Sequence, residues 1–207
     1  MPPASPAEAL APLDRALADL RDCQTRLASA ERQVQEAHAQ MEEMAALLFE
    51  QGASDALTGL KNRTAFDRIM RQQASRSARA HVPLSLVMVD VDGLGGINAS
   101  LGRVGGDHVL QQVATVLKAQ ARAYDYVVRY ESDCFCVVLP DTGADGALVV
   151  AERARAQLAA VRWRHRPVTV SMGVVTAHTV EGLATVERDG LELLQRAKAS
   201  GGDQLAR

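Results

Sequence analysis

Two charged side chains, Arg122 and Asp125, are spaced so that together they could read the edge of a guanine base. An arginine donates two parallel hydrogen bonds to the O6 and N7 atoms of guanine, and a neighbouring carboxylate can accept from N1 and N2. Residues three apart lie on one face of a helix, so both side chains could meet the same base. Taken alone, the pair also fits a surface ion pair, which would be worth roughly a few tenths of a kcal/mol.

A second set of residues has the chemistry of a metal site. Asp90 ends a run of apolar residues, and Asp133 lies in a short polar stretch between two further apolar runs. Carboxylate oxygens are the ligands that Mg²⁺ prefers, and phosphoryl transfer uses such ions in pairs. The residue after Asp133 is Cys134, whose neutral thiol is a poor ligand for Mg²⁺. The alternative is that Asp90 and Asp92 simply cap the end of a strand.

The elements that would position these side chains alternate between helices and strands. The apolar runs predict strands, and the segments with apolar residues on one helical face predict helices. Strands are expected at 84–90, 126–130, 135–139 and 168–175, and helices at 64–80, 105–122, 144–160 and 183–200. The second and third strands bracket a tight turn, which predicts a hairpin and therefore a sheet that is at least partly antiparallel.

The N-terminal part of the chain carries a seven-residue apolar repeat. One position of the repeat holds Leu13, Leu20, Leu27, Val34, Met41 and Leu48, and the other holds Ala16, Cys23, Ala30, Ala37 and Met44. Such a repeat predicts a coiled-coil helix over 10–51 that dimerises the chain, after a flexible terminus at 1–9. The small side chains leave the orientation of the two helices open. The alternative is a single amphipathic helix that packs on its own domain.

The composition excludes several classes of protein. The 207 residues carry a net charge of −2, so no overall basic field favours nucleic acid. Three cysteines form neither a metal-binding spacing nor an even disulfide set, which favours a reducing compartment. No apolar run is long enough for a membrane span. We therefore expect a cytoplasmic protein with no membrane span and no nucleic-acid partner.

From residue 54 to 207 the sequence resembles the GGDEF family, the diguanylate cyclases that condense two GTP molecules into cyclic di-GMP. The resemblance rests on motifs that occur in the family's order, namely Asp55–Arg63, Asp90–Asp92, Asn98–Asp107, Arg122–Asp125, Val168–Gly173 and Ala197–Lys198. It implies an α/β (α+β) fold of the cyclase-palm type, in which a central, mainly antiparallel sheet is flanked by helices. Here that domain would follow the long coiled-coil helix.

The signature turn of the family, Gly-Gly-Asp-Glu-Phe, reads Glu131–Phe135 here and has lost most of its residue types. Cys134 replaces a glutamate that is a metal ligand in the family, and two glycines that let the nucleotide lie against the backbone are gone. Gly95 and Gly202 stand where the family has phosphate-contacting cations. The resemblance therefore implies a degenerate site in which Asp90, Asp133 and Cys134 are vestigial, with metal held only by the two aspartates, if at all.

Some nucleotide-binding positions keep their residue types. Asn98, Asp107 and Lys198 match positions that contact GTP in the family, so a weak GTP site could persist. Asn98 and Asp107 also fit roles in turns and helix caps. We expect no cofactor, and Mg²⁺ only together with such residual GTP binding.

The inhibitory product site of the family is retained at Arg122 and Asp125, and Arg153 matches a further arginine of that site. The sequence therefore predicts a non-catalytic receptor that binds cyclic di-GMP at these three residues and signals through a dimeric coiled coil. The signal would pass to a protein partner that the sequence does not identify. The alternatives are a weakly active diguanylate cyclase with a divergent turn and a nucleotide-free scaffold for protein interaction.

Overall fold

The computed structural model describes residues 24, 26–27, 29–41, 52–163 and 166–207. The chain divides into two compact units, 1–52 and 53–207. In the first unit, residues 29–41 are helical, and the apolar side chains of Leu27, Val34 and Met41 are 59%, 68% and 62% exposed. The predicted flexible terminus and most of the predicted coiled coil lie outside the described residues. Within the described ranges, no helix is long and apolar enough to cross a membrane.

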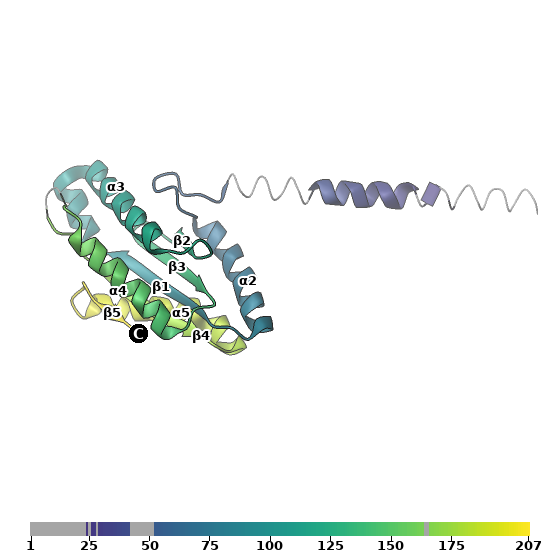
Figure 1. The fold of residues 1–207 in the computed structure, drawn as a ribbon. Helices are drawn as coiled ribbons and strands as arrows, with labels where there is room; N and C mark the ends of the chain where they lie inside the picture. The colour runs from purple at the N-terminus through teal and green to yellow at the C-terminus, as the bar shows by residue number, and fades with distance from the viewer. Residues whose placement is uncertain (1–23, 25, 28, 42–51, 164–165) are drawn as a thin grey trace, which may run out of the picture. The chain divides into compact units, whose positions relative to one another are not determined.

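The second unit is built on a five-stranded sheet (Figure 1). Its strands, in the spatial order β2-β3-β1-β4-β5, are β2 (Tyr126–Arg129), β3 (Cys134–Pro140), β1 (Leu84–Val91), β4 (Val170–Ala177) and β5 (Leu205–Ala206). The central strand β1 pairs antiparallel with both β3 and β4, and only the pairing of β4 with the two-residue β5 is parallel within this sheet. This arrangement confirms the expected mainly antiparallel sheet.

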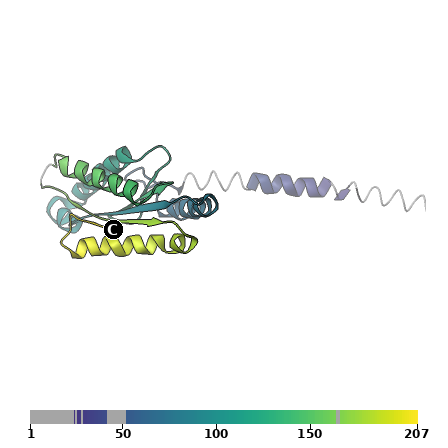
Figure 2. The same cartoon turned by 60° about the horizontal axis from the view of Figure 1, so that its bottom comes forward.

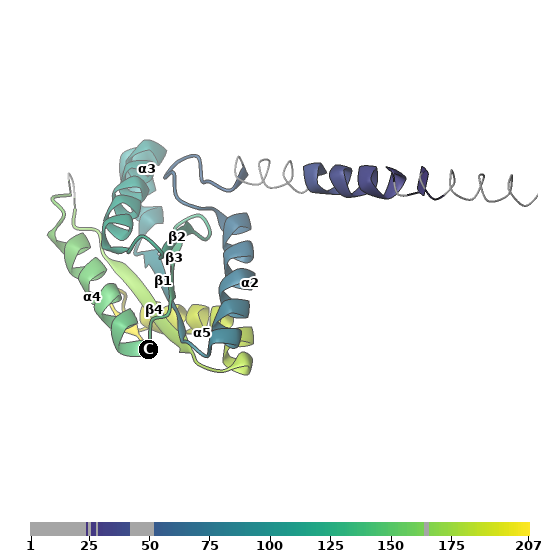
Figure 3. The ribbon, with the colours of Figure 1, turned by 45° about the vertical axis from the view of Figure 1, so that its right-hand side comes forward.

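Helices cover both faces of the sheet (Figures 2 and 3). They are α2 (Arg63–Ala80), α3 (Leu94–Gln120), α4 (Ala144–Ala160) and α5 (Val180–Ala199). Helices α3 and α4 lie on one face, and α2 and α5 lie on the other. Helix α2 begins where the Asn62 side chain accepts a hydrogen bond from the backbone N–H of Ala65, which satisfies a donor that the helix itself leaves unpaired.

The larger core lies between the sheet and helices α3 and α4. Successive side chains of a strand point to opposite faces, so Val87, Val89 and Val91 of β1 enter this core. They pack there with apolar residues of the helices, including Val109, Val113, Leu117, Ala147, Ala151 and Leu158. Burial of each large apolar side chain stabilises the fold by about 1.5–3 kcal/mol. The alternation leaves Asp90 facing the opposite side.

On that opposite side, α5 lies directly against β4. A Cβ atom added to Gly173 would come within 2.5 Å of both the carbonyl oxygen of Gly190 and the backbone nitrogen of Leu194. Real side chains do not tolerate such distances, so only glycine fits at position 173. This close approach fixes α5, and with it Lys198 near the end of the helix.

The structure differs from the expected elements most clearly at α3 and β5. Helix α3 begins at Leu94 rather than 105, and it continues through a non-helical residue, Gly102, at φ 71° and ψ 173°. The glycines in this stretch disfavour a helix by their flexibility, yet the packing of Leu94 and Ile97 in the core stabilises it. Strand β5 was not expected, because two residues carry no recognisable periodicity.

Candidate functional site

The carboxyl end of β1 opens into a pocket of about 530 Å³, which we call the strand-end pocket. Its lining residues are Asp90, Val91, Asp92, Gly93, Leu94, Gly95, Asp133, Lys198, Gly201 and Gly202. Asp90 lies opposite Cys134 of β3 and Ser171 of β4 in the sheet register. The structure thus brings together Asp90, Asp133 and Lys198, which come from three separate parts of the sequence.

Asp90 forms an ion pair with Lys198, whose Nζ lies 2.8 Å from Asp90 Oδ1. Burial raises the pKa of Asp90, and the hydrogen bond from Lys198 opposes this rise without cancelling it, since the nearby charges of Asp133 and Asp92 raise the pKa further. Burial lowers the pKa of Lys198, but its bond to Asp90 and the surrounding carboxylates raise it overall. The positive charge of Lys198 therefore lies where a metal ion bound to Asp90 would lie.

Asp92 has a different role from Asp90. Its Oδ1 accepts a hydrogen bond from Ser171 Oγ at 2.6 Å, and its Oδ2 accepts from Thr169 Oγ1 at 2.8 Å and from the backbone nitrogen of Asp203 at 2.9 Å. Three donors thus surround this carboxylate. It joins the end of β1 to β4 and to the segment before β5, in agreement with a structural role at the strand end.

Cys134 lies beside these carboxylates and is only 7% exposed. Burial raises the pKa of its thiol to about 12, and the negative charges of Asp90, Glu131 and Asp133 add to the effect. The thiol is consequently protonated at neutral pH. A protonated thiol offers no charge to a divalent cation, so Cys134 adds little to a metal site here.

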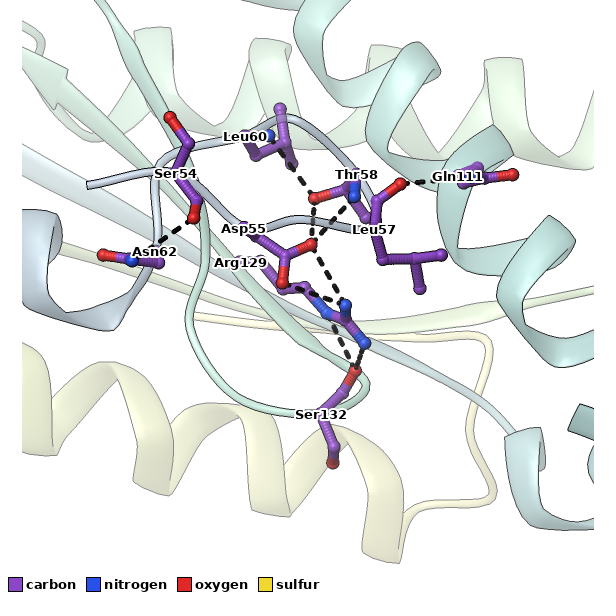
Figure 4. Close-up of polar contacts among 9 residues, drawn as sticks. All are labelled: Ser54, Asp55, Leu57, Thr58, Leu60, Asn62, Gln111, Arg129 and Ser132. Carbon is purple, nitrogen blue, oxygen red and sulfur yellow. Dashed lines mark hydrogen bonds and ion pairs between the residues drawn. The ribbon is translucent and has the colours of Figure 1, made fainter. Parts of the chain in front are cut away.

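The turn that carries Asp133 is held from the side by Arg129 (Figure 4). The Arg129 guanidinium donates to the carbonyl oxygen of Ser132 through Nη2 at 2.6 Å and through Nε at 3.1 Å. The same group pairs with the carboxylate of Asp55, which also accepts hydrogen bonds from the backbone and hydroxyl of Thr58. The sequence analysis missed Arg129, because its partner Asp55 is distant along the chain.

Asn98 and Asp107 lie in the two halves of α3, on either side of the break at Gly102. A Cβ atom on Gly106 would come within 1.8 Å of Asn98 Oδ1, so the Asn98 side chain rests on the glycine that precedes Asp107. The structure therefore places these two predicted residues at the same junction. Both lie within helical turns rather than at a helix cap.

A second pocket, of about 480 Å³, surrounds the turn after α3, and we call it the turn pocket. Its lining residues are Ser54, Gly59, Leu60, Lys61, Lys118, Ala121, Arg122, Ala123, Asp125, Tyr126 and Val127. Arg122 and Asp125 were expected at the end of a helix. The helix instead ends at Gln120, because Ala121 takes an extended conformation with ψ 144°. The pair therefore lies in the turn itself.

Within the turn, Asp125 and Arg122 are joined through the backbone. Asp125 Oδ2 accepts a hydrogen bond from the Arg122 backbone nitrogen at 2.7 Å, and the Arg122 guanidinium donates to the hydroxyl of Tyr124 at 3.1 Å. The other carboxylate oxygen, Asp125 Oδ1, is buried and has no hydrogen-bond partner among the described residues. Arg153 is not part of the lining, but its Nη2 donates to Gln120 Oε1 at 2.9 Å, next to the turn.

Residues 52–204 match the family described as "Diguanylate cyclase, GGDEF domain". The chain belongs to the GGDEF domain family. Among curated relatives, this GGDEF domain is 32% identical over 156 residues to the diguanylate cyclase DgcP of Pseudomonas aeruginosa. The match covers 73% of the chain and 23% of DgcP, so the chain spans about a quarter of that relative.

Solved structures of GGDEF proteins share the fold. The diguanylate cyclase SiaD of Pseudomonas aeruginosa, in complex with its activator SiaC, matches with a TM-score of 0.72 at 29% identity, over 97% of this chain and 77% of that one. A microbial GGDEF domain, reported for its interaction mode with cyclic di-GMP, matches with a TM-score of 0.67 at 27% identity, over 75% of this chain and 98% of that one.

Cyclase chemistry on a GGDEF domain would imply divalent metal ions, and the residues of the strand-end pocket do not fit a pair of them. Asp90 is already paired with Lys198, Asp92 is occupied by three donors, and Cys134 is protonated. In the part of the chain that the structure describes, no three His, Cys, Asp or Glu side chains are grouped to hold a metal ion. Asp133, the remaining carboxylate of the pocket lining, accepts a hydrogen bond from Ser132 Oγ at 2.9 Å.

Proposed function

We propose that this GGDEF domain is a non-catalytic receptor for cyclic di-GMP, which binds in the turn pocket at Arg122 and Asp125. The observation that carries the proposal is the buried Oδ1 of Asp125, for which no described residue provides a hydrogen-bond donor. A buried acceptor without a partner costs about 1–3 kcal/mol, and a ligand that donates to it would recover that free energy. The N1–H and N2–H groups of guanine are such donors.

The charges around the turn pocket favour a dinucleotide with two phosphates. Arg122 can pair with guanine O6 and N7 or with phosphate oxygens, while Lys61 and Lys118 line the same pocket. Arg153 lies beside it through Gln120 and would meet a ligand that extends past the turn. The structural likeness to a GGDEF domain reported with cyclic di-GMP supports this ligand.

The strand-end pocket supports the non-catalytic part of the proposal. Transfer between two GTP molecules would need metal ions that neutralise the phosphates. In this pocket Lys198, rather than a metal ion, neutralises the charge of Asp90. Glu131 brings a further negative charge to the turn, which would repel the phosphates. Asn98 and Asp107 remain together at the break in α3, so weak GTP binding without turnover is compatible with the receptor.

Signalling would pass through the N-terminal helix. The helical side chains of Leu27, Val34 and Met41 form an exposed apolar row at seven-residue spacing, which favours pairing of two chains. Ligand binding can change the arrangement of such a dimer only if cyclic di-GMP binds one arrangement more tightly than the other. A protein partner would then recognise the favoured arrangement, and the complex of SiaD with its activator supports a protein partner.

Calorimetric titration of the full chain with cyclic di-GMP tests the proposal. We expect saturable binding, which Arg122→Ala weakens at least about tenfold because a charge-assisted pair of hydrogen bonds is lost. Arg188→Ala, which removes an exposed guanidinium on α5, serves as the matched control and should leave the affinity unchanged.

A parallel incubation with GTP and Mg²⁺, analysed by chromatography, separates the receptor from a weak cyclase. Formation of cyclic di-GMP at a steady rate would refute the non-catalytic assignment. Equal affinity of wild type and Arg122→Ala would refute the site. Absence of binding of both cyclic di-GMP and GTP would leave the scaffold as the remaining function.

A further inference from the structure

Another pocket, of about 370 Å³, is lined by the part of α3 from Ile97 to Val109 and by Trp163, Arg166 and Val168. Its lining residues are Ile97, Leu101, Val104, Gly105, His108, Val109, Trp163, Arg166 and Val168. It shares none of these with the linings described for the strand-end pocket and the turn pocket. The volume is at the lower end of the range for small-molecule sites, which runs from about 300 to 1,000 Å³.

The inner part of this pocket is apolar and firmly held. Ile97, Val109 and Val168 are almost fully buried in the core and form its base. The indole of Trp163 forms one wall and is fixed in place, because its Nε1 donates a hydrogen bond to the carbonyl oxygen of Leu158 at 3.2 Å. A preformed apolar surface of this kind suits the apolar body of a ligand, whose burial is favourable by about 25 cal/mol per Å².

The outer part carries two basic side chains from separate elements. His108 comes from α3, and Arg166 comes from the segment before β4. Arg166 Nη2 donates to the carbonyl oxygen of Gly93 at 2.9 Å, which positions the guanidinium at the pocket. A guanidinium has five N–H donors, so the bond to Gly93 leaves other donors for a second acceptor. Val104 stands at the opening and is 82% exposed.

We propose that this pocket binds a small, compact apolar carboxylate. The apolar body would lie against Trp163 and the buried base, and the carboxylate would meet Arg166 and His108 at the opening. A planar guanidinium pairs with a carboxylate through two parallel hydrogen bonds. The pocket volume limits the ligand to a body of roughly ten to twenty heavy atoms, which excludes a dinucleotide such as cyclic di-GMP.

The sole tryptophan of the chain makes the proposal directly measurable, since Trp163 forms a wall of the pocket. We would titrate the full chain with adamantane-1-carboxylate, which is compact, apolar and transparent at the wavelength that excites tryptophan. A saturable change in emission is expected. The neutral adamantane-1-methanol has nearly the same shape without the charge, and it should bind at least about tenfold more weakly.

Two variants of the exposed Val104 serve as a matched pair that leaves the core intact. Val104→Glu places a carboxylate at the opening and should weaken binding of adamantane-1-carboxylate at least about tenfold by like-charge repulsion. Val104→Gln has the same shape without the charge and should bind adamantane-1-carboxylate within about twofold of wild type. Arg166→Gln should remove the preference for the carboxylate over the alcohol.

Either of two results would overturn the proposal. If the alcohol binds as tightly as the carboxylate, the site does not recognise an anion. If wild type gives no saturable emission change with adamantane-1-carboxylate up to its solubility limit, the space is a gap in the packing and not a binding site. Addition of cyclic di-GMP should not compete with the probe, because the turn pocket has different lining residues.

Discussion

The Nη1 atom of Arg129 lies 3.0 and 3.1 Å from the two carboxylate oxygens of Asp55. The two residues belong to β2 and to the segment before α2, and the same guanidinium also contacts the carbonyl oxygen of Ser132. The pair thus ties the start of the domain to the divergent turn. Any movement of the N-terminal segment that displaces Asp55 will also act on that turn.

Loss of this ion pair should destabilise the domain. Asp55→Asn removes the charge while keeping the shape, and we expect a loss of about 1–3 kcal/mol in the free energy of unfolding, measured by urea denaturation. Asp67→Asn, which breaks an exposed pair with Arg63, should cost less than about 0.5 kcal/mol. Equal costs for the two variants would contradict the prediction.

The pair of Asp55 and Arg129 also predicts how the stability of the domain depends on pH. Burial raises the pKa of Asp55, but hydrogen bonds from Thr58 and Arg129 lower it overall below its ordinary value of 3.8. The folded state therefore holds the ionised form more tightly than the unfolded state does. Its stabilising contribution is complete above about pH 5 and is lost as the pH falls through and below 3.8. The difference between wild type and Asp55→Asn should shrink over that acidic range.

Asp125 should couple ligand binding to stability. If the proposed site is right, cyclic di-GMP should raise the melting temperature of wild type, because the ligand would donate to the buried Oδ1 of Asp125. Asp125→Asn removes the charge of this acceptor, and we expect cyclic di-GMP to bind about tenfold more weakly. Differential scanning fluorimetry over a range of ligand concentrations measures both the ligand-induced rise in melting temperature and the weaker binding to the variant. An unchanged ligand-induced shift in Asp125→Asn would remove the main support for the proposed site.

A glutamate at position 134 should make the strand-end pocket sensitive to metal. Cys134→Glu adds a third carboxylate beside Asp90 and Asp133, and we expect it to destabilise the domain by about 2–4 kcal/mol in the presence of EDTA. Mg²⁺ should restore part of that loss, while wild type should not respond. Cys134→Gln, which lacks the charge, is the control, and a Mg²⁺ effect of equal size on it would show that the ion acts elsewhere.

Two glycine substitutions should have opposite signs. Gly173→Ala should destabilise the domain by about 1–3 kcal/mol or more, because its Cβ would clash with the backbone of α5. Gly95→Ala lies in α3 with open space around the added Cβ, so it should stabilise the helix by up to about 1 kcal/mol. Thermal unfolding of both variants tests the packing of α5 against β4 directly.

The apolar row of the N-terminal helix should mediate self-association. Val34→Glu places a charge in that row, and we expect the dimer to weaken at least about tenfold in sedimentation equilibrium. Gln35→Glu adds the same charge one position away from the row and serves as the control. A monomeric wild type would refute the coiled-coil dimer, which otherwise stays a prediction.

The sequence predicted the elements whose signal is local. Strands β1 and β3 are nearly continuous apolar runs, and α4 and α5 have regular amphipathic patterns, so their positions could be predicted to within a few residues. The first half of α3 could not be predicted, because Gly93, Gly95, Gly96 and Gly102 are typical of a loop. Core packing of its apolar residues outweighs that local preference.

For the candidate sites too, the sequence predicted local relationships but not contacts that depend on the fold. The types and spacing of Arg122 and Asp125 predicted that they belong together, and the structure places both in one pocket. It could not be foreseen that they occupy a turn rather than a helix, since this depends on the backbone of Ala121. The bonds of Asp92 to Thr169, Ser171 and Asp203 join distant parts of the chain, and no sequence pattern indicates such partners.

The position of β1 at the centre of the sheet has a consequence for how the protein is made. Both neighbours of this strand are synthesised later, β3 after a long helix and β4 only after a further helix. As the chain leaves the ribosome, both edges of β1 therefore stay unpaired until residues 134–140 have emerged, and one edge stays unpaired until residues 170–177 have emerged. Such late, non-local pairing is slow and prone to aggregation. We therefore expect newly made chains to depend on chaperones for longer than the finished domain's compact core would suggest.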